Sequence, residues 1–255
     1  MKLSDRITAY IAAASQKLLP KLPIIIVVNG VGFNKLTALI DKPFSTQLAK
    51  SLLGTLMHTV KEVEGAVFGY QYNDELIILT RNDQTVDTQP WYNNDAQTLA
   101  SVASSIATCY FNDLIDGDSE NLGIDDAVFR AKVFAVPSMS EAINALVYKQ
   151  QQAFQTSVSH ACLYELLKKG KNKMEIQDLL SNTTTEDKIS LLSQECEVEY
   201  HTAYPQVFRR GAACYRQPKL VEYQGKESVK MSWGFDTDLP IFTTNQSFLI
   251  DIINR

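Results

Sequence analysis

The stretch from Ile24 to Phe33, IIIVVNGVGF, decides how the first half of the chain is interpreted. Its apolar, largely β-branched run predicts a strand buried on both faces, and Asn29-Gly30 with Gly32 predicts a loop at the strand's end. Strand ends of this sort often present a carboxylate to a metal ion and a phosphate, but here the side chain at the tip is an amide. This stretch therefore leaves open whether the chain performs metal-dependent nucleotide chemistry or has lost it.

The segments around this strand alternate between strand and helix patterns. Helical periodicity predicts helices over 5–19, 45–64, 91–112 and 140–169. AVFGYQY and LIILTR predict a hairpin, and AKVFAVP predicts a fourth strand, after an acidic loop over 113–126. The βαββαβ order is ferredoxin-like, so the predicted fold class is α+β: an antiparallel sheet packed by helices, as in a polymerase palm.

In a palm, the active carboxylates sit at the tip of the first strand and at the turn between the second and third. These two places are occupied here by Asn29-Gly30 and by Asp74-Glu75. The positions and the residue types therefore match those of the palm carboxylates, except that position 29 carries an amide.

The remainder of the chain has a different pattern. Two short helices, a strand over 205–216, a hairpin from LVEYQG and VKMSWGF, and a last strand or helix near 246–253 are predicted. We expect a palm-like catalytic-type domain over 1–170 and a helical plus β-hairpin extension over 171–255 that packs on it.

Composition narrows the classes of function. The net charge of −5 argues against a protein that binds nucleic acid by overall charge alone. The four cysteines form no CxxC pair and the histidines number three, which disfavours a zinc site and fits a reducing compartment. The amino terminus has no signal-peptide pattern, and no run approaches the roughly 20 apolar residues of a membrane span. A cytoplasmic protein without a membrane segment is expected.

Seven stretches, in order along residues 5–216, resemble the tRNA-histidine guanylyltransferase family and its bacterial or phage-type relatives. NGVGF stands where that family has Asp-Gly-Arg-x-Phe, and FGYQYNDELIIL is similar to its Gly-Tyr-x-Gln-Ser-Asp-Glu strand. The other five are LIDKPF, SVASSIATCYFN, YKQQQAFQTSVSHACLYELLKKG, LLSNTTTEDKISLL and YPQVFRRGAACY. The family adds nucleotides in the 3′-to-5′ direction to the 5′ end of tRNA.

The resemblance implies a reaction with two Mg²⁺ ions and with GTP or ATP as substrate. It implies metal ligands at Asn29, the Gly30 carbonyl and Asp74, with Glu75 beside them in the catalytic set. The implied nucleotide contacts are Gly30, Val31, Gly32, Phe33, Lys42 and Asn73, and the implied RNA contacts are Arg209 and Arg210. A nucleoside triphosphate, tRNA and further copies of the chain, as a dimer or tetramer, are the implied partners.

Several residues depart from the family pattern where charge or polarity is needed. Asn29 offers one neutral oxygen in place of a carboxylate, and Val31 replaces an arginine. Other departures are Asn73, Thr98, Gln152, Gln155 and Thr156. The residues that shape the loops remain, which is the pattern of a fold kept while its chemistry was relaxed or changed.

Each candidate residue also has an ordinary interpretation. Asp74 and Glu75 fit a solvated hairpin turn, and Lys42 fits an Asp-Lys-Pro turn. Arg209 and Arg210 are interpreted as either RNA contacts or partners of nearby glutamates. His160 is expected to be an ordinary polar residue on a helix face.

Two functions of different class remain open from the sequence. The first is a tRNA nucleotidyltransferase in which Asp74, Glu75 and Gly30 hold a metal ion and Lys42 steadies the triphosphate. The second is an inactive relative that binds nucleotide or RNA and acts by sequestering, sensing or regulating. The lost charges favour the second, and the retained Asp74-Glu75 pair favours the first.

Overall fold

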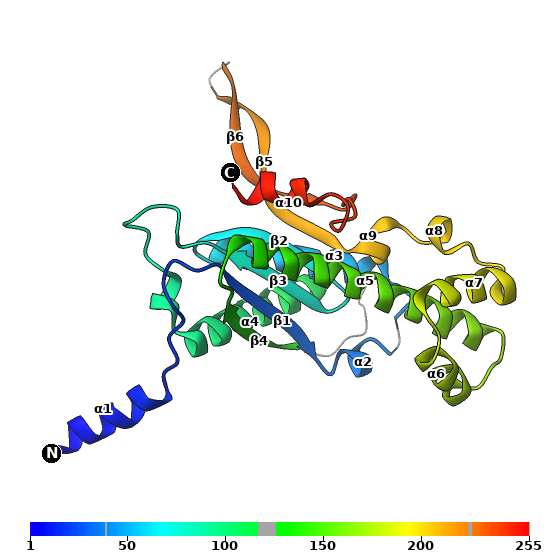
Figure 1. Cartoon of the computed structure of the whole chain (residues 1–255), viewed down its shortest axis with the longest axis horizontal. Coiled ribbons are helices and arrows are strands. Elements are labelled where there is room, and N and C mark those ends of the chain that lie inside the picture. Colours follow the sequence, from blue (N-terminus) through cyan, green and yellow to red (C-terminus); the bar gives the residue numbers. More distant parts are fainter. Residues whose placement is uncertain (39, 117–125, 224–225, 255) are drawn as a thin grey trace.

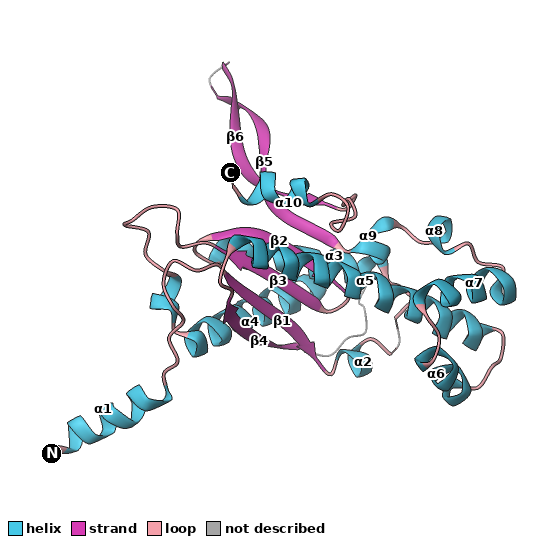
Figure 2. Cartoon of the chain, in the orientation of Figure 1, coloured by secondary structure: helices cyan, strands magenta, loops and turns pink. Residues whose placement is uncertain are grey.

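The computed structural model describes residues 1–38, 40–116, 126–223 and 226–254, and these ranges form an antiparallel sheet with helices on both faces (Figures 1 and 2). The strand order is β4-β1-β3-β2-β5-β6. The strands are β1 Ile24–Val31, β2 Ala66–Tyr72, β3 Glu75–Thr80, β4 Val128–Ala135, β5 Ala212–Tyr223 and β6 Lys226–Asp236. The helices are α1 Leu3–Ala14, α2 Phe33–Leu36, α3 Thr46–Glu62, η1 Trp91–Asn94, α4 Ala96–Asp116, α5 Met139–Lys168, α6 Lys173–Ser181, α7 Thr185–Cys196, α8 Tyr200–Ala203, α9 Gln206–Arg210 and α10 Gln246–Ile253.

The predicted α+β fold class is confirmed. The elements β1, α3, β2, β3, α4 and β4 follow one another in the predicted βαββαβ order, and β1 pairs with both β3 and β4. Because β1 lies between β4 and β3, its backbone groups are hydrogen-bonded on both sides, which suits the apolar run that the sequence places there.

Alternating side chains of β1 divide the core into two layers. Ile24, Ile26 and Val28 face one cluster, formed with α3 and α4, whereas Ile25 and Val27 face another, formed with α5 and α10. This is the period-two alternation of a strand that is covered on both faces. It also fixes the direction of Asn29, two residues beyond Val27, toward the α5 side of the sheet.

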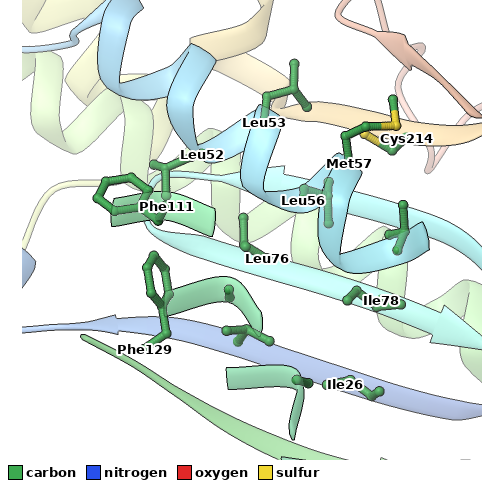
Figure 3. Close-up of a cluster of buried hydrophobic side chains, with 14 of the residues drawn as sticks. Ile26, Leu52, Leu53, Leu56, Met57, Leu76, Ile78, Phe111, Phe129 and Cys214 are labelled. Carbon is green, nitrogen blue, oxygen red and sulfur yellow. The ribbon is translucent and has the colours of Figure 1, made fainter. Parts of the chain in front are cut away.

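Three phenylalanine rings support the end of β1 from the other side. Phe33, Phe111 and Phe129 lie with ring centroids 5.2–5.5 Å apart, in tilted or edge-to-face contact. Phe111 from α4 and Phe129 from β4 meet below α3 in Figure 3. Tilted and edge-to-face aromatic contacts of this type are favourable beyond the area they bury. The loop after Asn29 therefore rests on a rigid aromatic base.

The carboxy-terminal part extends the same sheet. β5 pairs with β2, from Phe68 with Tyr215 to Gln71 with Ala212. A separate apolar cluster joins the end of α5 to α6, α7 and α8. The division into two domains near residue 170 stays a prediction.

The prediction of a strand over 205–216 is wrong for the first half of that range. Pro205 is the N-cap of the short helix α9, and Gly211, with φ of 75°, ends it before β5 begins. A Cβ on Gly211 would lie 2.4 Å from the Gln71 carbonyl oxygen, so only glycine fits this approach. The hydroxyl of Tyr70 donates a 2.6 Å hydrogen bond to the Arg210 carbonyl, which fixes this end of α9 to the sheet.

Other boundaries also differ from those predicted. The first helix ends at Ala14 rather than residue 19, since Lys17 forms an isolated bridge with Asp95. The helix predicted from residue 91 begins at Ala96, after the 3-10 turn η1, and continues to Asp116, beyond the predicted end. The rest of the predicted acidic loop, 117–125, lies outside the described residues. The last element, left open between strand and helix, is the helix α10.

Two elements project from the body, α1 at one end and the β5–β6 ribbon at another (Figure 1). Every residue of α1 is exposed, and beyond Pro218 the ribbon carries apolar side chains that are also exposed, among them Leu220 and Val229. Within the described ranges, none of the helices is both long and apolar enough to cross a membrane.

Candidate functional site

One row of side chains crosses four strands at the end of β1. The register pairs Arg130 of β4 with Asn29 of β1, Asn29 with Glu75 of β3, and Glu75 with Tyr72 of β2. Residues paired in an antiparallel register point to the same face of the sheet. Because Asn29 points to the α5 side, the whole row faces Lys149 on α5.

Glu75 is the centre of this row. The amide Nδ2 of Asn29 donates a 2.8 Å hydrogen bond to Glu75 Oε2, and Lys149 Nζ forms a 2.7 Å ion pair with Glu75 Oε1. The side chains of Lys149 and Glu75 are 21% and 12% exposed, so this is a largely desolvated pair. Burial, followed by the charge of Glu75, raises the pKa of Tyr72 well above its usual value. Both oxygens of Glu75 are thus engaged by this chain's own side chains.

Asp74 lies in the turn between β2 and β3, where Asn73 has a left-handed φ of 46°. The Gly30 amide donates a 3.1 Å hydrogen bond to the Asp74 carbonyl, so the two predicted loops do come together. Burial raises the pKa of the Asp74 carboxyl and Glu75 adds to the rise, whereas a hydrogen bond from the backbone and the charge of Arg130 oppose it. The two loops of the sequence hypothesis therefore lie next to each other in the structure.

Gly30 and Gly32 give this loop its shape. A Cβ on Gly30 would lie 2.1 Å from a ring carbon of Phe33, so the ring of Phe33 packs directly on the glycine. Gly32 has φ of 71° at the N-cap of α2, a conformation that side chains disfavour. Val31, by contrast, is 45% exposed and presents no charge.

A cavity of about 150 Å³ opens beside Asn73 and Asp74. Aromatic and cationic side chains line it, and Lys42 Nζ lies 5.7 Å from the ring centroid of Tyr164. Burial lowers the pKa of the Lys42 ammonium. The other lining residues of interest are Phe33, Asn34, Phe44, Gln71, Tyr72, His160 and Phe208.

The sequence did not predict two members of the site. Lys149 lies in the polar run KQQQ, whose pattern gives no sign that one lysine turns toward the sheet. His160 lines the cavity, and burial together with the charge of Lys42 lowers its pKa. The only available signal was helical spacing, because residues 149, 153, 160 and 164 are separated by four, seven and four positions, which places them on one helix face.

Arg209 and Arg210 lie on α9, directly after the cavity residues Val207 and Phe208. Arg209 Nε donates to the Tyr204 carbonyl at 2.9 Å, and an Arg210 terminal nitrogen donates to the Leu239 carbonyl at 3.3 Å. These contacts are to main-chain carbonyls rather than to the predicted glutamates. Contact of either arginine with RNA stays a prediction.

The donor set at this edge does not fit two divalent ions. Mg²⁺ prefers anionic oxygens in a near-octahedral arrangement, and two adjacent ions need several carboxylates between them. In the described part of the chain, no group of three or more His, Cys, Asp or Glu side chains is placed to hold a metal ion. The Asn29 amide nitrogen and Lys149 engage Glu75, which leaves the Asp74 carboxylate with two neutral oxygens, those of the Asn29 amide and the Gly30 carbonyl.

Two family models match the sequence. The model for tRNA(His) guanylyltransferase, Thg1, matches residues 6–137, and the model for the Thg1 C-terminal domain matches residues 144–240. Among curated proteins, tRNA(His) guanylyltransferase 2 of Arabidopsis thaliana is 23% identical over 84% of this chain and 40% of its own length. A probable tRNA(His) guanylyltransferase of Drosophila melanogaster is 23% identical over 83% of this chain and 73% of its own.

Solved structures show the same fold. A bacterial Thg1-like protein in complex with ATP superposes with a TM-score of 0.83 at 24% identity, covering all of both chains. A bacterial Thg1-like protein in complex with GTP superposes with a TM-score of 0.74 at 22% identity, covering 99% of each chain. The present chain spans about two fifths of the length of the Arabidopsis relatives that it matches.

Proposed function

Because the chain belongs to the tRNA(His) guanylyltransferase family, we propose that it binds GTP or ATP in the cavity beside Asp74 and a tRNA 5′ end next to it, without catalysing two-metal nucleotide addition. It then acts by sequestering, sensing or regulating. We place this activity in the cytoplasm.

The observation that carries this proposal is the Asn29–Glu75 hydrogen bond at 2.8 Å. With its amide nitrogen held by Glu75, the side chain at position 29 offers a metal ion one neutral oxygen and no negative charge. The ammonium of Lys149 supplies the charge that compensates Glu75 at 2.7 Å. The hydrogen bonds and the charge of Glu75 are therefore matched by this chain's own side chains. Two Mg²⁺ ions would have Asp74 as their main anionic ligand.

The character of the cavity supports nucleotide binding. Lys42 provides a cation for phosphate, and Phe44 and Tyr164 provide aromatic surface on which a base can stack. Gln71 and His160 provide polar groups for hydrogen bonds. Family relatives of the same fold form complexes with ATP and with GTP.

The proposed tRNA contact follows from the position of α9. Val207 and Phe208 line the cavity, and Arg209 and Arg210 are the next two residues of the same short helix. A guanidinium has five N–H donors, and the carbonyl contacts use only part of them. The remaining donors suit phosphate.

A second candidate function, Mg²⁺-dependent 3′-to-5′ nucleotide addition, is favoured by one contact. The hydrogen bond from the Gly30 amide to the Asp74 carbonyl holds the two loops next to each other. Under this alternative, Asp74 and the Gly30 carbonyl hold an ion together with the triphosphate.

Two measurements test the proposed function. Calorimetric titration with GTP and ATP is expected to show binding, and Lys42→Ala is expected to weaken it by about tenfold because a phosphate-binding charge is lost. Lys50→Ala is the matched control, since Lys50 is exposed on α3 and does not line the cavity. Addition of labelled nucleotide to 5′-monophosphate and 5′-triphosphate tRNA is expected to stay at background with Mg²⁺ or Mn²⁺. Robust extension would support the second candidate, and lack of nucleotide binding would overturn the first.

We also propose that the chain is a homo-oligomer in which α1 packs against a second copy. Leu3, Ile7, Tyr10 and Ile11 follow one helix face, and each is 46–68% exposed. A helix of about this length is marginal in water unless an apolar face is covered. A second copy of the chain is the partner that the family resemblance implies.

Replacing Ile7 and Ile11 together with glutamate is expected to lower the oligomeric state, because four charges in a dimer would meet in an apolar contact. Light scattering coupled to size-exclusion chromatography measures the mass. The control, Ala9→Glu with Ala12→Glu, adds the same charge on the opposite face of α1. An unchanged mass in the Ile7/Ile11 variant would show that α1 does not form the interface.

A further inference from the structure

We propose that this chain binds nucleoside triphosphate without a divalent cation, because the row at the end of β1 is electrically compensated by Lys149 and Arg130. The inference rests on the proposed nucleotide binding in the adjacent cavity and concerns the cation requirement of that binding.

The first step is the charge of the row itself. Asn29 is neutral, and the carboxylate of Glu75 is matched by the ammonium of Lys149 at 2.7 Å. Lys149 and Asn29 each take a different oxygen of Glu75, so the carboxylate is held at both ends. The group of three side chains therefore carries no net charge.

The second step concerns Asp74, the remaining acidic side chain of the β2–β3 turn. Arg130 is the register partner of Asn29, and its charge acts on Asp74. Arg130 is exposed, so its guanidinium is accessible to a phosphate at this edge of the sheet. With Arg130 included, positive and negative side chains at this edge balance.

The third step is what a triphosphate would meet. A site lined by uncompensated carboxylates repels a triphosphate, and bridging cations are then needed to bring the two together. Here Glu75 is paired with Lys149, and Lys42 adds a cation to the cavity, whose lining also includes the carboxylates of Asp41 and Asp74. Binding can therefore proceed through direct contact between phosphate and ammonium or guanidinium groups.

The experiment compares the affinity for GTP, measured by calorimetry, in excess EDTA and in excess Mg²⁺. We expect the two dissociation constants to agree within about threefold, since no cation is needed to offset repulsion. Inorganic tripolyphosphate is used in parallel as a probe of the phosphate contacts alone.

A pair of variants tests whether compensation by Lys149 is the cause. Lys149→Met leaves Glu75 uncompensated and is expected to weaken GTP binding in EDTA by at least about tenfold, with much of the loss recovered in Mg²⁺. The double variant, Lys149→Met with Glu75→Gln, removes both charges and is expected to bind GTP in EDTA within about threefold of the unchanged chain. The double variant also serves if the single variant folds poorly, because no charge is left unpaired.

The outcomes separate the two proposals. Binding of GTP in Mg²⁺ but not in EDTA would overturn the cation-independent inference and leave the proposed nucleotide binding intact. Loss of EDTA binding in the double variant would overturn charge compensation as its cause. If the unchanged chain binds GTP under neither condition, both proposals fail.

Discussion

Replacing Phe111 with alanine is expected to lower the free energy of unfolding by about 3–5 kcal/mol, the usual cost of removing a buried aromatic side chain. Phe111 is fully buried, and its ring centroid lies 5.5 Å from that of Phe33 and 5.4 Å from that of Phe129. The substitution removes packing and leaves a cavity beneath the loop that carries Asn29 and Gly30. Urea-induced unfolding followed by circular dichroism gives the difference in free energy.

Phe134→Ala is the matched control. Phe134 lies on β4, as Phe129 does, but it is 41% exposed and is expected to cost less than about 1 kcal/mol. Because Phe33 lines the cavity and packs on Phe111, the Phe111 variant should also bind GTP more weakly than the control. Equal losses of stability in the two variants would show that the aromatic base does not support this loop.

The strands around this base could be predicted because their signals are local. The apolar run predicts the position of β1, and the polar turn at Asn73-Asp74 predicts where β2 ends and β3 begins. The βαββαβ order then places the end of β1 next to the β2–β3 turn. The strand order and the likeness to a palm predicted that the two loops meet, and the structure joins them by the hydrogen bond from the Gly30 amide to the Asp74 carbonyl.

The wrong prediction at α9 shows where local signals fail. The sequence PQVFRRG contains Val207 and Phe208, which favour strands, so a strand was expected to begin there. Pro205 and Gly211 instead bound a short helix, and the Tyr70 hydroxyl fixes its end from β2. That hydrogen bond joins residues 140 positions apart, so no local sequence pattern predicts it.

The ion pair between Lys149 and Glu75 could not be predicted for the same reason. Lys149 is 74 residues away from Glu75 along the chain, within a polar stretch whose residues all look suited to solvent. Its direction is set by the way α5 lies across the sheet, with Leu146 and Ala153 in the apolar cluster on either side of it. The sequence could show that Asn29 lacks a charge, but the source of the opposing charge required the fold.

Asn29→Asp is expected to create a divalent-cation site, with Mn²⁺ bound about 100-fold more tightly than by the unchanged chain. The substitution replaces the Asn29 nitrogen, 2.8 Å from Glu75, with an anionic oxygen, so a donor becomes a repelling charge. The new carboxylate, Asp74 and the Gly30 carbonyl would then present the oxygen ligands that Mg²⁺ and Mn²⁺ prefer. Without cation, the like charges opposite each other in the register should lower the melting temperature.

Calorimetric titration with Mn²⁺ measures the affinity, and the melting temperature of the variant should rise with added Mn²⁺ because the cation binds the folded state. Asn34→Asp is the matched control, since it makes the same change at an exposed residue of α2 that lines the cavity but lies outside the row. In the Asn29 variant, GTP binding should become dependent on Mg²⁺, and nucleotide addition to tRNA should appear with Mn²⁺. If Mn²⁺ binds both variants equally weakly, the amide at position 29 is not what keeps divalent ions from this edge of the sheet.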